Sequence, residues 1–139
     1  MSGTGSVIEL KKFLVENGAL FTPASEDDIL ALERDVNFPV SEDYKFYLKE
    51  FGTILFKDRE TYGLGVPETY YLNVLHAYQA LQRVPEFPGT MLPLAGSGDG
   101  AWYLYDNEER KVFSWQIAGI AENIEKSMLD FLQFFLGLA

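Results

Sequence analysis

Few residues in this sequence could carry covalent or metal chemistry. It contains one histidine, His76, and no cysteine. A chain with this inventory cannot assemble a His-rich zinc site, a Cys–His dyad or a disulfide. The nucleophile elbow Gly-x-Ser-x-Gly of hydrolases is absent as well, because the residues around Ser97 read Gly96-Ser97-Gly98. We therefore predict that the protein is not an enzyme and has no catalytic residue and no metal ligand.

The glycine-rich segment 96–100 lacks the surroundings of a phosphate-binding loop. Such a loop leads into a helix N-terminus and usually has a lysine nearby. Here residues 101–105 alternate like a strand, no lysine follows directly, and Asp99 would repel a phosphate. The segment therefore predicts a turn between two strands, in which glycines supply positive φ angles, and no cofactor site.

Paired carboxylates are frequent, but each group has a local explanation. Glu26-Asp27-Asp28 and Glu42-Asp43 fall in the first turns of predicted helices, where the helix dipole favours negative charge. Glu108-Glu109 falls in a predicted hairpin turn. General acid catalysis needs a carboxyl group in an apolar pocket that raises its pKa. Asp106, which follows an aromatic strand, is the nearest candidate, yet an Asp-Asn pair at this point more simply begins a turn.

The chain is acidic, with 11 Lys and Arg against 21 Asp and Glu in 139 residues and a net charge of −10. Binding to nucleic acid or to an anionic membrane depends on basic residues, so this charge argues against both partners. It favours a basic protein partner, or serves solubility alone. No signal peptide is recognisable, and the apolar cluster 128–138 is too short to span a membrane, so we expect a cytoplasmic protein.

The first third of the chain predicts helices. Residues 7–17 carry apolar side chains at helical spacing, and Gly18 is placed to end that helix. Ser25 and Ser41 each precede acidic residues and an apolar helical pattern, which predicts two further helices with these serines as N-caps. The small polar residues 1–6 are expected to form a flexible N-terminus.

The rest of the chain predicts a sheet with two more helices. The expected strands are 53–56, 62–65, 91–95, 101–105 and 111–115. Residues 57–60 are expected to form a turn, and helices are expected at 73–83 and at about 121–136. The sequence therefore predicts an α+β fold over residues 7–139. It is a single domain with a central, mostly antiparallel sheet flanked by N-terminal helices and a C-terminal helix.

Two stretches of the sequence resemble one known family. The first comprises ASEDDILALE at 24–33, FPVSEDYKFYL at 38–48 and FG at 51–52. The second comprises LPLA at 92–95, GDG at 98–100, WYLYD at 102–106, VFSW at 112–115 and SMLDFL at 127–132. In order and spacing these pieces resemble the Smi1/Knr4 superfamily, also called SUKH, over roughly residues 7–136. Val40 stands where that family generally has a proline, and segment 57–90 matches little.

This resemblance implies an α+β fold with a mostly antiparallel sheet, and it implies no catalytic residues. Small bacterial members of the superfamily are immunity proteins that bind and neutralise a toxin domain. We therefore expect an immunity protein whose partner is a toxin domain with a basic surface, such as a nuclease. An intracellular adaptor or peptide-binding module unrelated to toxin immunity is the alternative.

The expected contact surface combines carboxylates with aromatic side chains. Alternation places Trp102 and Tyr103 on opposite faces of their strand, so helices cover both rings or leave one open to solvent. Tyr and Trp are favoured anchors in protein interfaces. The residues expected to contact the partner are Asp99, Trp102, Tyr103, Asp106, Glu108 and Glu109, with Glu26, Asp27 and Asp28 as a second choice.

Overall fold

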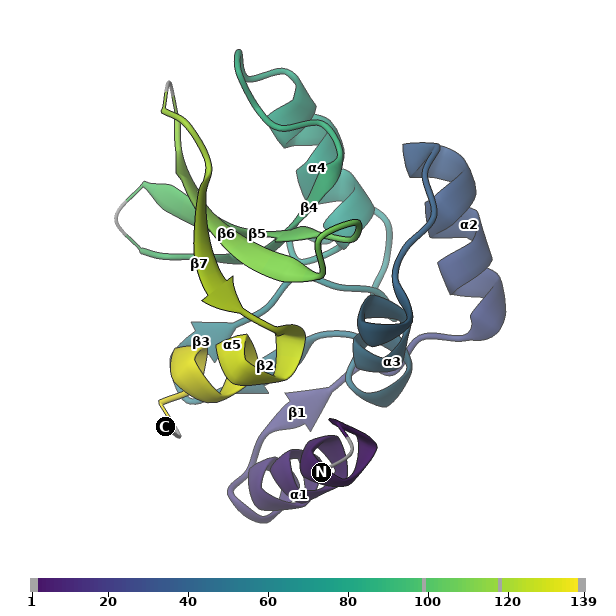
Figure 1. The fold of residues 1–139 in the computed structure, drawn as a ribbon. Coiled ribbons are helices and arrows are strands. Elements are labelled where there is room, and N and C mark those ends of the chain that lie inside the picture. Colours follow the sequence, from purple (N-terminus) through teal and green to yellow (C-terminus); the bar gives the residue numbers. More distant parts are fainter. Residues whose placement is uncertain (1–2, 99, 118, 138–139) are drawn as a thin grey trace.

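The computed structural model describes residues 3–98, 100–117 and 119–137 and has the predicted α+β fold. Five helices and two antiparallel sheets make up this part of the chain (Figure 1). The helices are α1 (Gly3–Glu16), α2 (Glu26–Val36), α3 (Glu42–Glu50), α4 (Val74–Gln82) and α5 (Met128–Phe135). The strands are β1 (Leu20–Phe21), β2 (Ile54–Phe56), β3 (Arg59–Glu60), β4 (Met91–Gly96), β5 (Ala101–Asp106), β6 (Lys111–Gln116) and β7 (Glu122–Lys126).

Side-chain caps set where four of the helices begin. Ser25 precedes α2 and forms a capping box, in which its hydroxyl accepts a hydrogen bond from the Asp28 amide and the Asp28 carboxylate accepts one from the Ser25 amide. Ser41 caps α3 through its hydroxyl. The predictions for these two serines are confirmed. Asn73 and Ser127 cap α4 and α5 in the same way.

The four-stranded sheet, in the order β4-β5-β6-β7, is covered by helices on both faces (Figure 1). On one face, Trp102 and Trp115 pack in a hydrophobic cluster with Leu81 of α4. On the other face, the Tyr103 ring lies 5.0 Å from the Phe131 ring of α5, measured between centroids. The sequence left open whether helices cover both the Trp102 ring and the Tyr103 ring or only one of them. In the structure, helices lie over both faces of β5.

Glycines allow the chain to pass close to Thr22, beside the three-stranded sheet β1-β2-β3. The Thr22 hydroxyl donates to the Leu64 carbonyl at 2.8 Å and accepts from the Thr53 amide at 3.0 Å. A Cβ atom on Gly52 would lie 1.6 Å from the Thr22 carbonyl oxygen, and one on Gly65 would lie 1.9 Å from it. Both glycines also have positive φ, so no other residue fits either position without movement of the backbone.

The predicted elements of the middle segment need correction. The strand predicted at 62–65 is wrong, because β3 lies at Arg59–Glu60, inside the predicted turn. Lys57 has a φ of 57°, which lets the chain reverse tightly between Phe56 and Arg59. The Tyr62 amide instead donates to the Leu94 carbonyl at 2.8 Å and so links the region after β3 to strand β4.

The helix predicted at about 121–136 is wrong in its first part. Residues 122–126 form the edge strand β7, and α5 begins only after Ser127. Within β7, the Asn123 side chain accepts from the Glu125 amide at 2.8 Å, and Glu125 has a φ of 57°. This local bond gives the chain an alternative to helical hydrogen bonding. At the other end of the chain, α1 begins at Gly3, four residues before the predicted start at Val7.

Candidate protein-binding surface

The predicted contact residues lie at the two ends of strand β5 and do not form one patch. Trp102 is near the start of β5, and Asp106 is its last residue. At about 3.4 Å per strand residue, their backbones are about 13 Å apart. Asp99 lies outside the described residues. Among the described residues, the structure therefore separates Trp102 from the acidic residues of the turn that follows β5.

Asp106 begins the turn that joins β5 to β6. Its Oδ1 accepts hydrogen bonds from the backbone amides of Glu108 at 2.8 Å and Glu109 at 3.1 Å. The turn closes at Arg110, which has a φ of 57°. The simpler interpretation of Asp106, that it starts a turn, is therefore confirmed. Glu108 and Glu109 are exposed on this turn and remain candidates for partner contact.

Asn107 joins the β5–β6 turn to the start of α3, a contact that sequence reasoning missed. The Ser41 amide donates to Asn107 Oδ1 at 2.8 Å, and the Ser41 hydroxyl lies 3.3 Å from the Tyr105 hydroxyl. Burial raises the pKa of Tyr105, and the hydrogen bond with Ser41 opposes part of that increase. Nothing in the sequence beyond the Asp-Asn pair signals this contact.

The two aromatic candidates serve the core and are only partly open to solvent. Trp102 is half-buried, and its ring lies 5.7 Å from the Trp115 ring. Tyr103 is also half-buried and packs against Phe131 and Phe135 of α5. Most of the area of these rings is therefore used within the protein. Their role in partner binding stays a prediction.

The acidic first turn of α2 is also occupied by local interactions. Glu26 forms an ion pair with Lys49 near the end of α3, and Asp28 completes the capping box. Asp27 is exposed. Because Asn107 contacts the start of α3 and Glu26 contacts its last turn, the two predicted acidic groups are about 12 Å apart along this helix. They do not form one continuous acidic surface.

Two neighbouring exposed aromatic side chains lie in the loop before α4, apart from the exposed Phe13 of α1 and Phe134 of α5. Tyr70 and Tyr71 are both exposed, and their ring centroids are 4.8 Å apart. The Tyr71 hydroxyl donates to the Glu60 carboxylate, and this hydrogen bond is the main reason that the pKa of Tyr71 is raised. Sequence reasoning missed this pair. The available signal was two adjacent tyrosines after Pro67, in a segment with neither helical nor strand periodicity.

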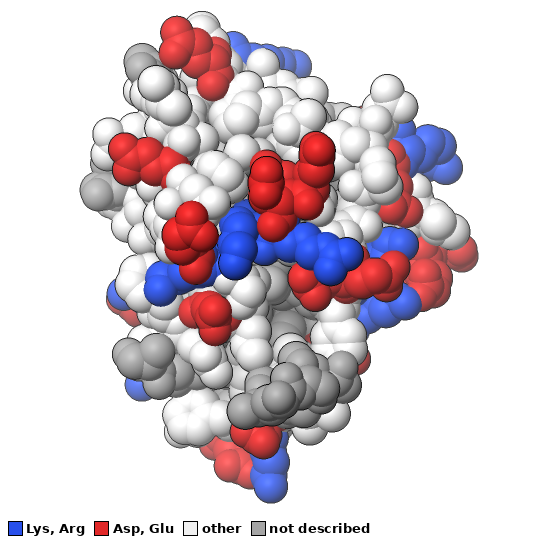
Figure 2. Space-filling model, in the orientation of Figure 1, with Lys and Arg blue, Asp and Glu red and all other residues white. Residues whose placement is uncertain are grey.

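Charged side chains of both signs share the surface. On the face shown in Figure 2, a row of Lys and Arg crosses the middle of the molecule, with Asp and Glu on both sides. Several are paired, such as Lys11 with Glu50 at 3.3 Å and Lys45 with Glu42 at 3.6 Å. The face shown in Figure 2 therefore mixes basic and acidic side chains and does not form one acidic patch.

Buried polar groups in the described residues belong to the fold. Apart from tyrosines, the buried polar side chains there are Thr53, Thr61 and Asn73. The Tyr47 hydroxyl lies 2.6 Å from the Thr61 hydroxyl and donates to the Tyr62 carbonyl at 2.7 Å, and burial raises the pKa of Tyr47. The same residues include no group of three or more His, Asp or Glu placed to hold a metal ion. None of their helices is both long and apolar enough to cross a membrane.

Comparisons with known proteins agree on the fold and the family. A crystal structure of a protein from Pseudomonas syringae pv. tomato is similar with a TM-score of 0.76 and 17% sequence identity, over 94% of this chain and 98% of that one. At this identity the likeness shows the fold alone. No curated protein matches the sequence. A SUKH family model described as SMI1-KNR4 cell-wall matches residues 26–132, so the chain belongs to the SMI1-KNR4 (SUKH) family.

Proposed function

We propose that this protein is a non-catalytic immunity protein that binds a toxin domain and blocks its activity. Membership of the SMI1-KNR4 family supports the proposal, because the family includes immunity proteins. The chain has 21 acidic and 11 basic residues, and this acidic excess supports a partner with a basic surface. A nuclease is the toxin class that fits best, since its substrate cleft must attract phosphates.

The observation that carries this proposal is the position of the carboxylates. Every Asp and Glu in the described residues is exposed or half-exposed, so each is available at the surface. An enzyme that used a carboxyl as general acid would need to bury it among apolar groups. Surface carboxylates instead create a negative field that attracts a basic protein and speeds its association, and this effect weakens as salt screens the charges.

The experiment is co-expression with the product of the neighbouring gene, tested as the candidate toxin, followed by binding measurements with the purified pair. We expect the protein to restore growth of cells that express the toxin domain. We also expect association to be slower at about 300 mM salt than at about 50 mM salt, because screening weakens attraction between opposite charges. A toxin domain that stays fully active beside an excess of this protein would contradict the proposal. Reversible binding to several unrelated basic peptides, without protection, would favour the adaptor alternative.

A further inference from the structure

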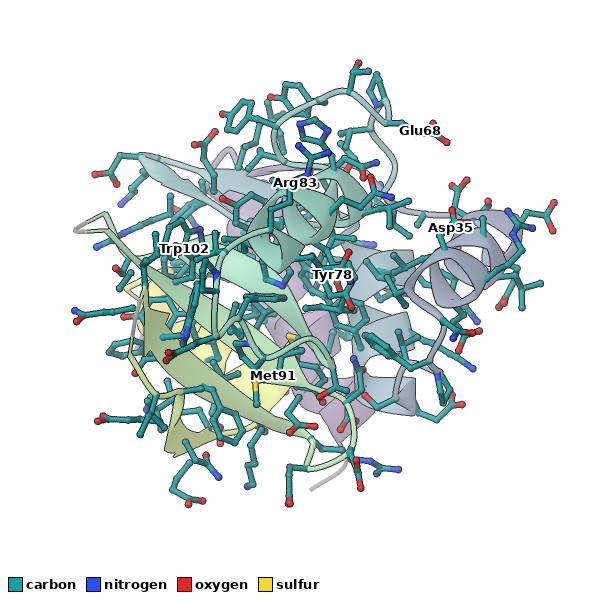
Figure 3. All side chains as sticks on the ribbon, turned by 90° about the horizontal axis from the view of Figure 1, so that it is seen from above. Asp35, Glu68, Tyr78, Arg83, Met91 and Trp102 are labelled. Atoms are coloured by element: carbon teal, nitrogen blue, oxygen red, sulfur yellow. The ribbon has the colours of Figure 1, made fainter. Side chains whose placement is uncertain are left out.

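A hollow of about 420 Å³ opens between helix α2 and the segment 64–75 that leads into α4. We call it the α2 groove and define it by Asp28, Ala31 and Asp35 of α2 and by Val66, Glu68 and Leu75 on the opposite side. Figure 3 shows Asp35 on α2 and Glu68 on the neighbouring loop, at the same edge of the molecule. No residue of the β5–β6 turn is among the described residues that line the groove.

The rim of the α2 groove is acidic on both sides. Asp28 and Asp35 are seven residues apart in α2, which places them about 10 Å apart along the helix axis. Glu68 provides a third carboxylate from the loop. No Lys or Arg is among the described residues that line the groove. Arg34, outside it, has its Nε 3.7 Å from Asp35 Oδ1, but both side chains are well exposed, so this pair is weak and readily exchanged.

The floor between these carboxylates is apolar and partly accessible. Ala31 lies between Asp28 and Asp35 on α2, and Val66 and Leu75 face it from the loop and the first turn of α4. All three apolar side chains are half-buried, so they keep surface that a further aliphatic group could cover. The groove therefore offers one apolar contact area between two negative positions.

Both walls of the groove are held in place before any partner binds. The capping box of Ser25 and Asp28 fixes the start of α2. On the other wall, the Asn73 side chain caps α4 and also donates to the Val66 carbonyl at 3.4 Å. Gly65 lies directly against the backbone of Thr22. A preformed groove loses little conformational entropy when it is filled, which favours binding.

We propose that the α2 groove binds an extended basic segment of the partner protein, in which an aliphatic residue stands between two Lys or Arg residues. This inference rests on the proposed function and names the chemistry of the contact. In an extended chain, residues i, i+2 and i+4 point to the same side, and i and i+4 are about 13 Å apart. Flexible Lys or Arg side chains can adjust this spacing to the carboxylates of Asp28 and Asp35, while the central aliphatic side chain covers Ala31.

The test uses the full chain, labelled with ¹⁵N, and an acetylated and amidated heptapeptide of sequence SKSLSKS. We expect its addition to shift the backbone amide signals of residues 28–35 and 64–75. Two matched peptides separate the contribution of charge from that of the aliphatic side chain. SESLSES reverses the charges, and SKSSSKS removes the aliphatic group. Both should bind at least several-fold more weakly. Shifts located elsewhere, no shifts at millimolar SKSLSKS, or equal binding of all three peptides would overturn the proposal.

Charge-removing variants complete the test. Asp35→Asn with Glu68→Gln should weaken SKSLSKS binding about tenfold at low salt, because the charge contact at Asp35 and the attraction of the Glu68 carboxylate on the opposite side are both lost. The control Glu9→Gln with Glu16→Gln removes the same number of exposed charges from helix α1, outside the groove, and should leave binding unchanged. Equal effects of the two double variants would show a non-specific charge effect and overturn the proposal.

The toxin assay separates this inference from the proposed function. If the wild-type protein protects cells and the Asp35→Asn/Glu68→Gln variant protects equally well at limiting expression, the groove proposal fails while the immunity function stands. If the wild-type protein does not protect but the peptide still binds in the groove as described, the immunity function fails. In that case the groove is a peptide-binding site of another kind of protein.

Discussion

The β5–β6 turn and the α2 groove each contain three carboxylates, but these side chains differ in what they contact. In the turn, Asp106 accepts two backbone amides, and neighbouring Asn107 accepts a third from the start of α3. In the groove, Asp35 and Glu68 stand on opposite sides of an open apolar floor. Asp106 therefore stabilises the fold, Asp35 and Glu68 lie beside an open groove, and Asp28 does both, because it completes the capping box of α2 and also lines the groove.

This difference gives a criterion for choosing which acidic residues are expected to contact a partner protein. A carboxylate that accepts two backbone amides through one oxygen, as Asp106 does, mainly stabilises its own turn. No Lys or Arg is among the described residues that line the groove, and Arg34 pairs with Asp35 only weakly from outside it, so a basic partner would meet an excess of negative charge there. Substitutions in the turn are therefore expected to reduce stability, and substitutions of the groove rim are expected to reduce binding.

The largest expected effect is at Gly65, in the wall of the groove. Gly65→Ala should destabilise the fold by about 3 kcal/mol or more, because a positive φ and a clash with a backbone oxygen act together. The Cβ would lie 1.9 Å from the Thr22 carbonyl oxygen. Gly18→Ala is the matched control, since Gly18 has a similar φ of 86° but nothing within 4 Å of its Cβ position. It should cost only about 1 kcal/mol. Urea unfolding measures both, and equal losses would contradict the close approach at Thr22.

The next effect is at Asn107, on the turn side of the comparison. Asn107→Ala removes the acceptor of the Ser41 amide and should cost about 2 kcal/mol, because a backbone donor then lacks its partner. Asn17→Ala is the control. The Asn17 side chain also bonds a backbone group, the Phe13 carbonyl at 2.8 Å, but at an exposed site where water can replace it, so that loss should stay below about 1 kcal/mol. Similar losses for the two variants would show that the turn is not fixed to α3 by Asn107.

The elements with strong local signals could be predicted from the sequence. Ser25 and Ser41 are followed by acids and an apolar helical pattern, and α2 and α3 begin where these signals place them. The three strands β4, β5 and β6 follow from alternation between turn residues. In these segments the local preferences and the tertiary packing agree, so the pattern alone is sufficient.

Elements that depend on distant contacts could not be predicted. Strand β7 has the composition of a helix, with glutamates and a lysine around Ile124, and it becomes a strand by pairing with β6. The α2 groove forms between segments about 40 residues apart, so no local pattern marks Asp35 and Glu68 as neighbours. The sequence analysis did identify acidic residues as candidates, but it could not show which of them accept backbone amides, as Asp106 does, and which line a groove, as Asp35 and Glu68 do.

A smaller loss of stability is expected when the turn carboxylate itself is removed. Asp106→Ala deletes the acceptor of the Glu108 and Glu109 amides and should cost about 1 kcal/mol, since both amides are exposed enough to bind water instead. Asp106→Asn keeps an oxygen acceptor and should recover most of that stability. Thermal unfolding of the two variants measures the difference. If Asp106→Asn were as destabilised as Asp106→Ala, the carboxylate would act through its charge and not through the turn.

The smallest expected effect on stability is at the groove rim, where the comparison is sharpest. Asp35→Asn with Glu68→Gln should change the free energy of unfolding by less than about 0.5 kcal/mol, because both side chains are exposed and only the weak contact of Asp35 with Arg34 is lost. Urea unfolding of this variant and of Asp106→Ala measures the stability of each. Titration of both variants with SKSLSKS measures peptide binding independently. We expect the rim variant to keep its stability and lose binding, and Asp106→Ala to lose stability and keep binding at temperatures where it is folded. A rim variant that unfolded as readily as Asp106→Ala would mean that these carboxylates, too, belong to the fold, and the distinction between the two regions would not hold.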